Sequence, residues 1–337
     1  MLLFDSRWIG ENGIGRFAQE IYNGLQLDST QEYKNDYNPV SPFDPFRLSL
    51  DKKLQTCELF FSPGYNSPIF CKKPYILTVH DLNHIDRNEN SSILKRLYYR
   101  TILNRLCHNA AAILTVSEFS KKRIIEFFSV QENKVFVVGN GVSHHFTVRS
   151  NKIVLDKPYI FCVSNRKGHK NEESLIHAFA KTKAGEEIKL VFSGNTTDYL
   201  TNLLRSLNIE KNVIFTGRLS DDELANYYRG ALFSVFPSLY EGFGLPIVES
   251  FACGTAVITS NITSMPEIAG DAALLVNPHD IDEIARGIDK LFSDSNVRDI
   301  LAKKGLERAK LYTWDNVVRN VKYAFSQLGY EYLIEKK

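Results

Sequence analysis

The sequence has no long hydrophobic run. None of its 337 residues lies in a stretch of 18 consecutive apolar residues, whereas a membrane-spanning helix needs about 20 of them. The opening MLLFDSRWIG reaches Asp5 and Arg7 after only three apolar residues beyond Met1, too few for the apolar core of a secretory leader. We therefore expect no signal peptide and no membrane span, and we expect a cytoplasmic protein.

Cysteine is scarce, and neither sign of charge dominates. The five cysteines form no CxxC pair, which argues against a disulfide framework or a structural zinc site and fits a reducing compartment. Basic and acidic residues number 41 and 39, for a net charge of +2, so nucleic acid is not an expected partner. No repeat of 20–50 residues occurs, which argues against a solenoid or a propeller.

Short β-branched and aromatic runs alternate with helical patterns along the whole chain. Strands are predicted at residues 2–5, 58–62, 75–80, 111–117, 134–138, 159–163, 189–193, 213–217, 232–236, 256–260 and 273–276. Helices are predicted at residues 15–27, 92–108, 118–128, 171–182, 197–207, 220–230, 246–253, 280–292, 295–311 and 314–333. This alternation predicts parallel sheets with helices on both faces.

A polar break near residues 141–158 separates the predicted strands into groups of five and six. The length also suits roughly two domains of about 100–200 residues each. We predict an α/β protein with two Rossmann-like domains, residues 1–150 and 151–312, whose parallel sheets face each other across a cleft. Helices close the chain, and we expect the last segment, 313–337, to cross back to the first domain.

Two groups of polar residues follow predicted strands of the first domain, at the edge where open parallel sheets bind ligands. Gly13 and Gly15 in GENGIGRFAQEI precede a helix, an arrangement that suits an anion site and equally a tight turn. The loop differs from the dinucleotide fingerprint GxGxxG, so it is weak evidence for NAD. His80 in TVHDLNHID, with its acidic and histidine neighbours, could ligate a metal, but a hydrogen-bonding pocket residue is the favoured interpretation.

In the second domain, VSNRKGHKNEES brings Arg166 and Lys170 to a strand-to-helix loop. A solvated basic loop is one interpretation, and a phosphate site is the favoured one. The segment SLYEGFGLPIVESFACG places Glu241 before a short helix and Glu249 in its predicted first turn. The glycines beside Glu241 allow a ligand to approach the backbone, and a carboxylate can accept hydrogen bonds from two adjacent hydroxyls of a sugar.

At these segments the sequence resembles the retaining glycosyltransferases of family 4, which have the two-domain GT-B architecture. The E-x7-E motif of the family appears as Glu241-GFGLPIV-Glu249, followed by ACGTAVITSNITSMPEIAGDAALLVNP. TVHDL, TVSEFSK, VGNGV, RKGHKN and FTGRLSDDEL also occur in the family's order. Ser164 stands where many members have glycine. The resemblance covers nearly the whole chain.

The resemblance implies a nucleotide-sugar donor whose diphosphate is neutralised by Arg166 and Lys170. It implies that Glu241 contacts the donor sugar and Glu249 the ribose. The catalytic residues implied are Glu241, His80, Arg166 and Lys170. The donor-binding residues implied are Gly13, Gly15, Gly217, Arg218, Phe243, Gly244, Leu245 and Glu249.

The expected activity is therefore retaining transfer of a hexose from a nucleoside-diphosphate sugar to a glycan or lipid-linked acceptor in surface polysaccharide assembly. GDP-mannose is the first expected donor, and UDP-sugars are the alternative. No metal or other cofactor is expected. A nucleotide-sugar epimerase, a NAD oxidoreductase and a non-catalytic binding module remain as alternatives.

Residues 91–125 carry an excess of positive charge. Seven basic residues and one acidic residue, Glu118, occur there, and Leu94, Leu97 and Tyr98 recur beside them at helical spacing. Packing of this helix on the sheet would explain the apolar residues but not the charge. The pattern predicts peripheral contact with an anionic membrane, at the inner face of the cell membrane.

Overall fold

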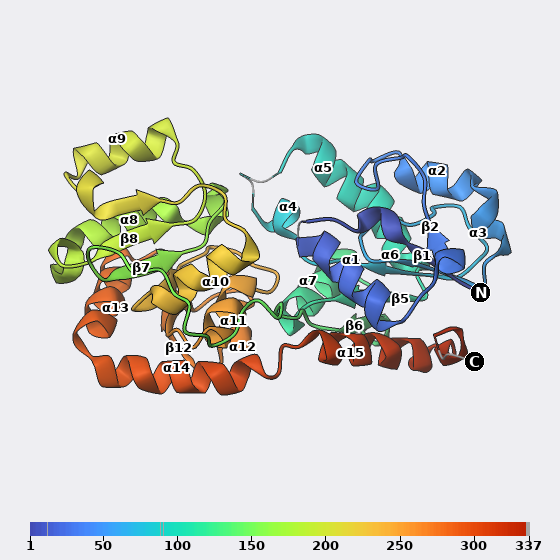
Figure 1. The fold of residues 1–337 in the computed structure, drawn as a ribbon. Coiled ribbons are helices and arrows are strands. Elements are labelled where there is room, and N and C mark those ends of the chain that lie inside the picture. Colours follow the sequence, from blue (N-terminus) through green and yellow to red (C-terminus); the bar gives the residue numbers. More distant parts are fainter. Residues whose placement is uncertain (12, 88, 90, 335–337) are drawn as a thin grey trace. The chain divides into compact units, whose positions relative to one another are not determined.

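The computed structural model describes residues 1–11, 13–87, 89 and 91–334 (Figure 1). The chain divides into two units, Met1–Gly141 together with Thr313–Lys337, and Val142–Tyr312. Within the described residues, no helix is both long enough and apolar enough to cross a membrane.

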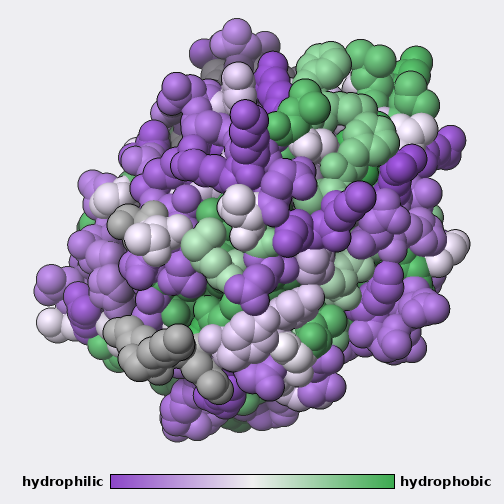
Figure 2. Space-filling view, turned by 90° about the vertical axis from the view of Figure 1, so that its right-hand side faces the viewer, coloured by the Kyte–Doolittle hydropathy of each residue, from purple (hydrophilic) through white to green (hydrophobic). Residues whose placement is uncertain are grey.

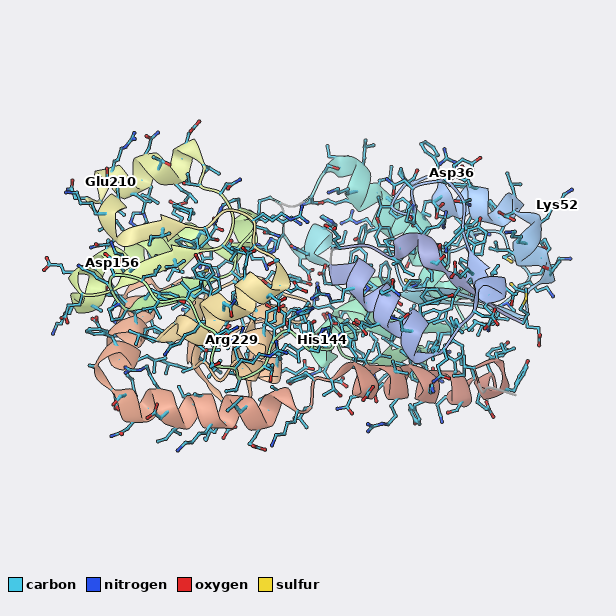
Figure 3. The ribbon with its side chains drawn as sticks, in the orientation of Figure 1. Asp36, Lys52, His144, Asp156, Glu210 and Arg229 are labelled. Atoms are coloured by element: carbon cyan, nitrogen blue, oxygen red, sulfur yellow. The ribbon has the colours of Figure 1, made fainter. Side chains whose placement is uncertain are left out.

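The boundary between the two units lies between residues 141 and 142, whereas the polar break in the sequence predicts this boundary at residue 150. The intervening segment packs on the second unit, where the ring of Phe146 lies 6.0 Å from that of Tyr228. Arg229, labelled in Figure 3, holds it there by donating to the carbonyls of Thr147 (2.9 Å) and Asn151 (2.7 Å). These anchors are distant in sequence, so a local pattern does not predict them.

The first unit contains a six-stranded parallel sheet with the order β2-β1-β3-β4-β5-β6. Its strands are β1 (Leu2–Asp5), β2 (Glu32–Tyr33), β3 (Leu59–Ser62), β4 (Tyr75–Thr78), β5 (Ala112–Thr115) and β6 (Val135–Val137). Five of them are predicted from the sequence, and β2 is not. Because every residue of β1, β3, β4 and β5 is buried, both faces of the sheet need covering.

Helices cover the two faces of this sheet separately. Phe4 and Phe61 face a core shared with α1 (Gly13–Gly24) and α15 (Trp314–Gln327). The neighbouring residues Leu3 and Phe60 face the opposite core, as the alternation of side chains along a strand requires. That second core includes residues of α2 (Asp44–Leu50), α3 (Lys52–Thr56), α6 (Asn104–Asn109) and α7 (Glu118–Phe128).

The helix predicted at residues 92–108 is interrupted. It consists of α5 (Ile93–Tyr98), a π-helical turn η4 (Tyr99–Leu103) and α6. The short helices α2, α3 and α4 (Asn83–Asp86) were not expected from the sequence. Each of them has fewer than eight residues, too few for a clear helical period.

The second unit contains another six-stranded parallel sheet, with the order β12-β11-β10-β7-β8-β9. Its strands are β7 (Tyr159–Cys162), β8 (Lys189–Phe192), β9 (Val213–Phe215), β10 (Phe233–Phe236), β11 (Val257–Ser260) and β12 (Ala273–Val276). One core holds residues of α8 (Glu172–Lys181), α9 (Asp198–Ser206) and α13 (Ile281–Ser293). The sequence predicts all six strands.

The opposite face of this sheet carries α10 (Asp221–Gly230) and α11 (Leu245–Ala252). The long helix α14 (Ser295–Ala309) packs on α11 through Gly305, where a Cβ would lie 2.5 Å from the ring of Phe251. Only glycine permits this approach, because real Cβ contacts are never so short. The predicted fold class of two Rossmann-like parallel sheets with closing helices is confirmed.

Candidate functional site

The strand order of the second unit identifies the sheet edge to search. From β7 the chain first adds strands on one side, β8 and β9, and then crosses to the other side for β10, β11 and β12. Ligands of open parallel sheets bind at such a switch, beyond the carboxyl ends of the two central strands. Here these strands are β7 and β10. The segment after β7 contains VSNRKGHKNEES, which we call the basic motif, and the segment after β10 contains SLYEGFGLPIVESFACG, which we call the acidic motif.

The two loops are bonded to each other. The Leu239 amide donates to the His169 carbonyl (2.7 Å), and the side-chain amide of Asn171 donates to the carbonyls of Pro237 (3.0 Å) and Pro278 (2.8 Å). Asn171 has a positive φ of 59°, a conformation that Asn tolerates better than most residues. The backbone of both loops is thereby fixed at the centre of the edge.

This arrangement brings Lys170 and Glu241 into contact. Lys170 Nζ donates to Glu241 Oε1 at 2.7 Å, and each side chain is 13% exposed. The ammonium also lies 5.1 Å from the ring centroid of Phe236. The sequence predicts both residues as site residues, but it places them in separate motifs. An anionic ligand at this edge would compete with Glu241 for the Lys170 charge.

The last residue of β11 and the loop that follows this strand hold the backbone around Glu241 in place. Ser264 Oγ donates to the carbonyls of Glu241 (2.9 Å) and Phe243 (3.0 Å). Ser260 Oγ donates to the Ser238 carbonyl at 2.6 Å. Both hydroxyl groups are buried, so the carboxylate loop is held by satisfied polar contacts.

The loop that follows Glu241 ends at the N-terminus of α11. Gly244 precedes the helix with φ of 100°, in the left-handed region that favours glycine. Pro246 has no N–H and the Ile247 amide donates to the Gly244 carbonyl (3.0 Å), so the Leu245 amide and the helix dipole are what this terminus offers to an anion. Leu245 begins the helix and Phe243 packs edge-on against Tyr312, with ring centroids 5.5 Å apart.

Glu249 lies in the second turn of α11, because the helix begins at Leu245. The sequence predicts Glu249 in the first turn of this helix, and that prediction is wrong. The Tyr228 hydroxyl donates to Glu249 Oε2 at 3.0 Å. Burial, and to a smaller extent the nearby charge of Glu249, raises the pKa of Tyr228 well above its usual range. The hydroxyl therefore keeps its proton and remains a donor.

The guanidinium of Arg166 is already engaged within the second unit. It pairs with Glu172 and donates to the carbonyls of Ser193 and Asn195, the latter at 2.6 Å from Nε. Its Cζ lies 5.0 Å from the ring centroid of Phe215. These acceptors take three of the five N–H groups of the guanidinium, whereas Lys170 Nζ donates to the carboxylate of Glu241.

Glu172 is a buried carboxylate at the start of α8. It accepts from Ser164 Oγ as well as from Arg166, and the Arg166 amide also donates to it, at 3.4 Å. Burial outweighs these contacts and raises the pKa of Glu172 above its ordinary value. Ser164 is therefore bonded to the carboxylate partner of Arg166.

Gly217 and Arg218 lie at the carboxyl end of β9. Gly217 exchanges two backbone hydrogen bonds with Gly194, at 2.7 and 3.2 Å, and the two residues have φ of 75° and 79°. A Cβ on Gly194 would lie 3.4 Å from Arg166 Nη2. This glycine bridge therefore lies directly against the Arg166 guanidinium, and Arg218 beside it is exposed.

In the first unit, Gly13, Gly15 and His80 lie near the corresponding switch, where β1 has β2 on one side and β3 on the other. His80 Nε2 is 3.0 Å from the Pro63 carbonyl in the loop after β3. Its ring packs edge-on on Phe17 of α1, with centroids 4.9 Å apart. Burial lowers the pKa of His80, which favours the neutral ring at pH 7.

The glycine loop allows a matched pair of substitutions. A Cβ on Gly15 would lie 2.4 Å from the Gly10 carbonyl oxygen, while a Cβ on Gly13 has no heavy atom within 4 Å. We expect Gly15→Ala to destabilise the first unit by about 1–3 kcal/mol through overpacking, and Gly13→Ala to leave its stability nearly unchanged. Urea unfolding followed by circular dichroism measures both. Equal losses in the two variants would contradict the close approach at Gly15.

The acidic residues near His80 that could ligate a metal are engaged in other hydrogen bonds. Asp86 accepts two hydrogen bonds from Arg123, at 2.6 and 3.1 Å, and the Asp81 carboxylate accepts from the Asn83 amide at 2.9 Å. In the part of the chain that the structure describes, no group of three or more His, Cys, Asp or Glu side chains is placed to hold a metal ion.

Both units of the chain contain segments that match known protein families. Residues 145–308 match the family described as Glycosyl transferases group 1, and residues 13–146 match Glycosyltransferase Family 4. O-antigen chain mannosyltransferase B from Escherichia coli is 30% identical over 284 residues, which cover 80% of this chain and 74% of that protein. The chain belongs to glycosyltransferase family 4.

Solved structures show the same fold. The family 4 chain superposes on sucrose-phosphate synthase from Thermosynechococcus elongatus with a TM-score of 0.80 and 17% identity, covering 98% of this chain and 99% of the other. The Anabaena protein HepE in complex with UDP-glucose gives 0.78 and 17% identity, covering 97% and 99%. The family consists of retaining hexosyltransferases, so the predicted class of enzyme is confirmed.

Three residues of this glycosyltransferase were missed as site residues by the sequence analysis. Glu172 pairs with Arg166, Tyr228 donates to Glu249, and Ser264 supports the Glu241 loop. Glu172 is visible in the basic motif itself, as the acidic residue that follows HKN. Tyr228 lies 21 residues before its partner, and nothing local in the sequence identifies it.

Proposed function

We propose that this glycosyltransferase transfers mannose from GDP-mannose, with retention, to a hydroxyl group of a glycan or lipid-linked acceptor in surface polysaccharide assembly. The observation that carries the proposal is the contact of Lys170 with Glu241 at the sheet switch, beside the N-terminus of α11. A cation, a carboxylate and the positive end of a helix dipole together suit a diphosphate joined to a sugar.

The proposed reaction breaks the bond between the anomeric carbon and a diphosphate oxygen. The acceptor oxygen bonds to the anomeric carbon on the same face, and the departing phosphate oxygen accepts the hydroxyl proton. Lys170 and the α11 amides stabilise the charge that develops on the leaving diphosphate. The donor thus supplies the base, and no protein nucleophile is needed.

Each carboxylate then has its own task. Glu241, released from Lys170, accepts hydrogen bonds from the hydroxyls of the donor sugar. Glu249, oriented by the Tyr228 hydroxyl, accepts from the ribose. The backbone of Phe243, Gly244 and Leu245 donates to the donor.

The remaining predicted contacts are retained as proposals. Arg166 acts at the diphosphate, and Gly217 and Arg218 lie beside the nucleobase. In the first unit, His80 contacts the sugar and the loop of Gly13 and Gly15 contacts the phosphates. These assignments rest on the family resemblance.

The proposed donor is chosen from the printed activities of similar proteins. The Escherichia coli relative is named as a mannosyltransferase of an O-antigen chain, which favours mannose and a polysaccharide acceptor. The structural similarity to HepE with UDP-glucose favours a second candidate, transfer from a UDP-sugar. A nucleotide-sugar epimerase would use the same site without an acceptor.

A donor screen tests this function. We expect GDP and GDP-mannose to raise the melting temperature more than UDP or UDP-glucose, and GDP-mannose to be slowly hydrolysed to GDP and α-mannose. EDTA is not expected to abolish turnover, because Lys170 and the helix amides replace a metal in the proposed mechanism. Preference for a UDP-sugar would overturn the donor, and formation of an epimer from donor alone would overturn transfer.

A further inference from the structure

The first unit contains a cavity that the proposed mechanism does not use. Its volume is about 210 Å³, and it lies wholly within Met1–Gly141. Four of its lining residues are aromatic, namely Tyr65, His84, Tyr98 and Tyr99. Sites for drug-sized ligands have volumes of about 300–1,000 Å³, so this smaller cavity suits a single ring and not an extended chain.

The first sheet places this cavity at its ligand-binding edge. Tyr65 follows β3, and His84 lies in α4, which follows β4. Both therefore lie beyond the carboxyl ends of parallel strands, where open sheets bind ligands. His80 lies at the same edge, and its Nε2 is 3.0 Å from the carbonyl of Pro63, in the loop that continues to Tyr65. The cavity thus shares an edge of the sheet with the histidine that we assign to the donor sugar.

The aromatic rings of the cavity form one connected cluster around Tyr65. Its ring centroid lies 6.4 Å from that of Tyr98, 6.5 Å from that of Tyr99 and 5.4 Å from that of Trp8. His84 packs edge-on against Tyr99, with centroids 6.3 Å apart. The face of an aromatic ring carries partial negative charge, so it attracts the C–H groups on one side of a sugar ring. A tyrosine also offers a hydroxyl group to the sugar hydroxyls.

Tyr98 and Tyr99 come from the point where the helix changes its turn. Tyr98 is the last residue of α5, and Tyr99 is the first residue of the π-helical turn η4. Single π-helical turns are rare and occur frequently at functional sites. At this turn, two consecutive residues of one helix line the same cavity.

The tyrosine hydroxyls of the cavity are hydrogen-bond donors. Burial raises the pKa of Tyr98 and of Tyr99 above the usual range, so both keep their protons. The Tyr98 hydroxyl donates to Asn66 Oδ1. Tyr99 is only 7% exposed, and among the residues that the structure describes its hydroxyl has no hydrogen-bond partner. A ligand in the cavity can supply that acceptor.

The loop that forms one wall of the cavity is fixed by buried polar contacts. Asn66, which is fully buried, donates to the carbonyls of the residues on either side of Val40, at 2.7 and 3.0 Å. A few residues further on, the two carboxylate oxygens of Asp44 accept from Arg7 at 2.8 and 3.0 Å. The wall that contains Val40 is therefore held in place without a ligand, as in a preformed site.

The cavity opens beside apolar side chains. Val40 and Leu94 line it and are 49% and 77% exposed. Figure 2 shows hydrophobic side chains gathered at the top of this face, the height at which α2 and α5 lie in Figure 1. A purely apolar occupant would bury the Tyr99 hydroxyl without a partner, which is unfavourable. A sugar ring has both an apolar face and hydroxyl groups, and it suits both kinds of surface.

We propose that this cavity binds one sugar ring of the acceptor glycan. Tyr65 stacks on the C–H face of the ring, and the Tyr99 hydroxyl donates to one of its oxygens. The nature of the ligand rests on the proposed function, but the residues that bind it all belong to the first unit. Tyr65 is thereby a specificity-determining residue for the acceptor and not for the donor.

Saturation-transfer NMR on the full chain tests the site without turnover. The probes are the methyl glycosides of mannose, galactose, rhamnose and N-acetylglucosamine, each titrated for its Kd. We expect at least one to bind, and Tyr65→Ala to weaken its binding about tenfold through loss of the stacking ring. Tyr65→Phe keeps the ring and should bind within about threefold of the wild type. Tyr37→Ala removes a tyrosine that is 51% exposed outside the cavity, and it should bind like the wild type.

A second pair of variants tests the cavity without removing a packed ring. Leu94→Trp places an indole at the cavity and should weaken glycoside binding about fivefold or more, because a bulky group there clashes with the ligand. Ile93→Trp, at a neighbouring residue that is exposed and does not line the cavity, should bind like the wild type. Circular dichroism verifies that all the variants are folded.

Hydrolysis of GDP-mannose by the wild type separates this proposal from the proposed donor. Glycoside binding that depends on Tyr65, without hydrolysis of GDP-mannose, would overturn the donor and support the cavity. Three results would overturn the cavity alone. They are hydrolysis with none of the glycosides bound, equal losses in Tyr65→Ala and Tyr37→Ala or in the two tryptophan variants, and binding of isoprenol with none of the glycosides bound.

Discussion

Lys170→Ala is expected to reduce kcat/KM by about 10²- to 10³-fold, the usual effect of removing one preorganised group that stabilises developing charge. Lys170 supplies the side-chain cation nearest to Glu241, at 2.7 Å, and in the proposed mechanism it moves to the leaving diphosphate. The variant should also lose affinity for nucleoside diphosphate while keeping its affinity for the free nucleoside. Steady-state kinetics and calorimetric titration measure the two effects.

The same loop provides the control. Lys167 is three residues away and exposed, so Lys167→Ala removes the same charge from the loop without removing a contact to Glu241. We expect less than a threefold change in kcat/KM for Lys167→Ala, because exposed charges contribute little. If the two lysine variants lose activity equally, the role of Lys170 is not specific and the proposed site is wrong.

The double variant Glu241→Ala with Lys170→Ala distinguishes a purely structural role of this contact from separate roles of the two residues in donor binding. If the pair only stabilises the fold, the double variant should be about as active as the worse single variant. If each residue holds a different part of the donor, the losses in kcat/KM should multiply. We expect them to multiply, because the proposed donor separates the two side chains.

Glu172→Ala is expected to cause the largest loss of stability in the second unit. Glu172 is the carboxylate partner of Arg166, and the two side chains are only 8% and 16% exposed. Breaking a buried ion pair from one side costs about 3–5 kcal/mol, because it leaves the other charge unpaired. The midpoint of urea unfolding, followed by circular dichroism, should fall accordingly.

Glu173 serves as the matched control because it is the next residue and is exposed. Glu173→Ala should change the free energy of unfolding by less than about 1 kcal/mol. Glu172→Gln should recover part of the loss, since an amide oxygen still accepts from Arg166 and Ser164. An unfolding midpoint for Glu172→Ala that matches Glu173→Ala would show that the pair contributes nothing to the fold.

The regular strands could be predicted because the physics that forms them is local. Buried parallel strands such as β4 and β5 read as continuous apolar runs, ILT and AILT. Strand β2 has two residues, Glu32 and Tyr33, and gains its place only by pairing with β1. The position of the boundary after residue 141 depends on Arg229, which lies some 80 residues beyond the carbonyls to which it donates.

The site was predictable where a motif contains the chemistry and not where partners come from distant elements. Lys170 and Glu241 were identified separately, but their contact depends on β7 and β10 being neighbours in the sheet. The engagement of Arg166 by Ser193 and Asn195 depends in the same way on β8 lying beside β7. A charge count of the basic motif cannot distinguish the engaged Arg166 from the more loosely held Lys170.

Helix α15 has a consequence for how the protein is made. Val317, Val321 and Phe325 fill one face of the first sheet, yet the ribosome makes them after the whole second unit, Val142–Tyr312. During synthesis, that face with Phe4 and Phe61 is covered only by α1, while the second unit can already complete its core. The first unit therefore completes its core only after α15 is made, and the part of the apolar face that α15 covers is a natural binding site for a chaperone until then.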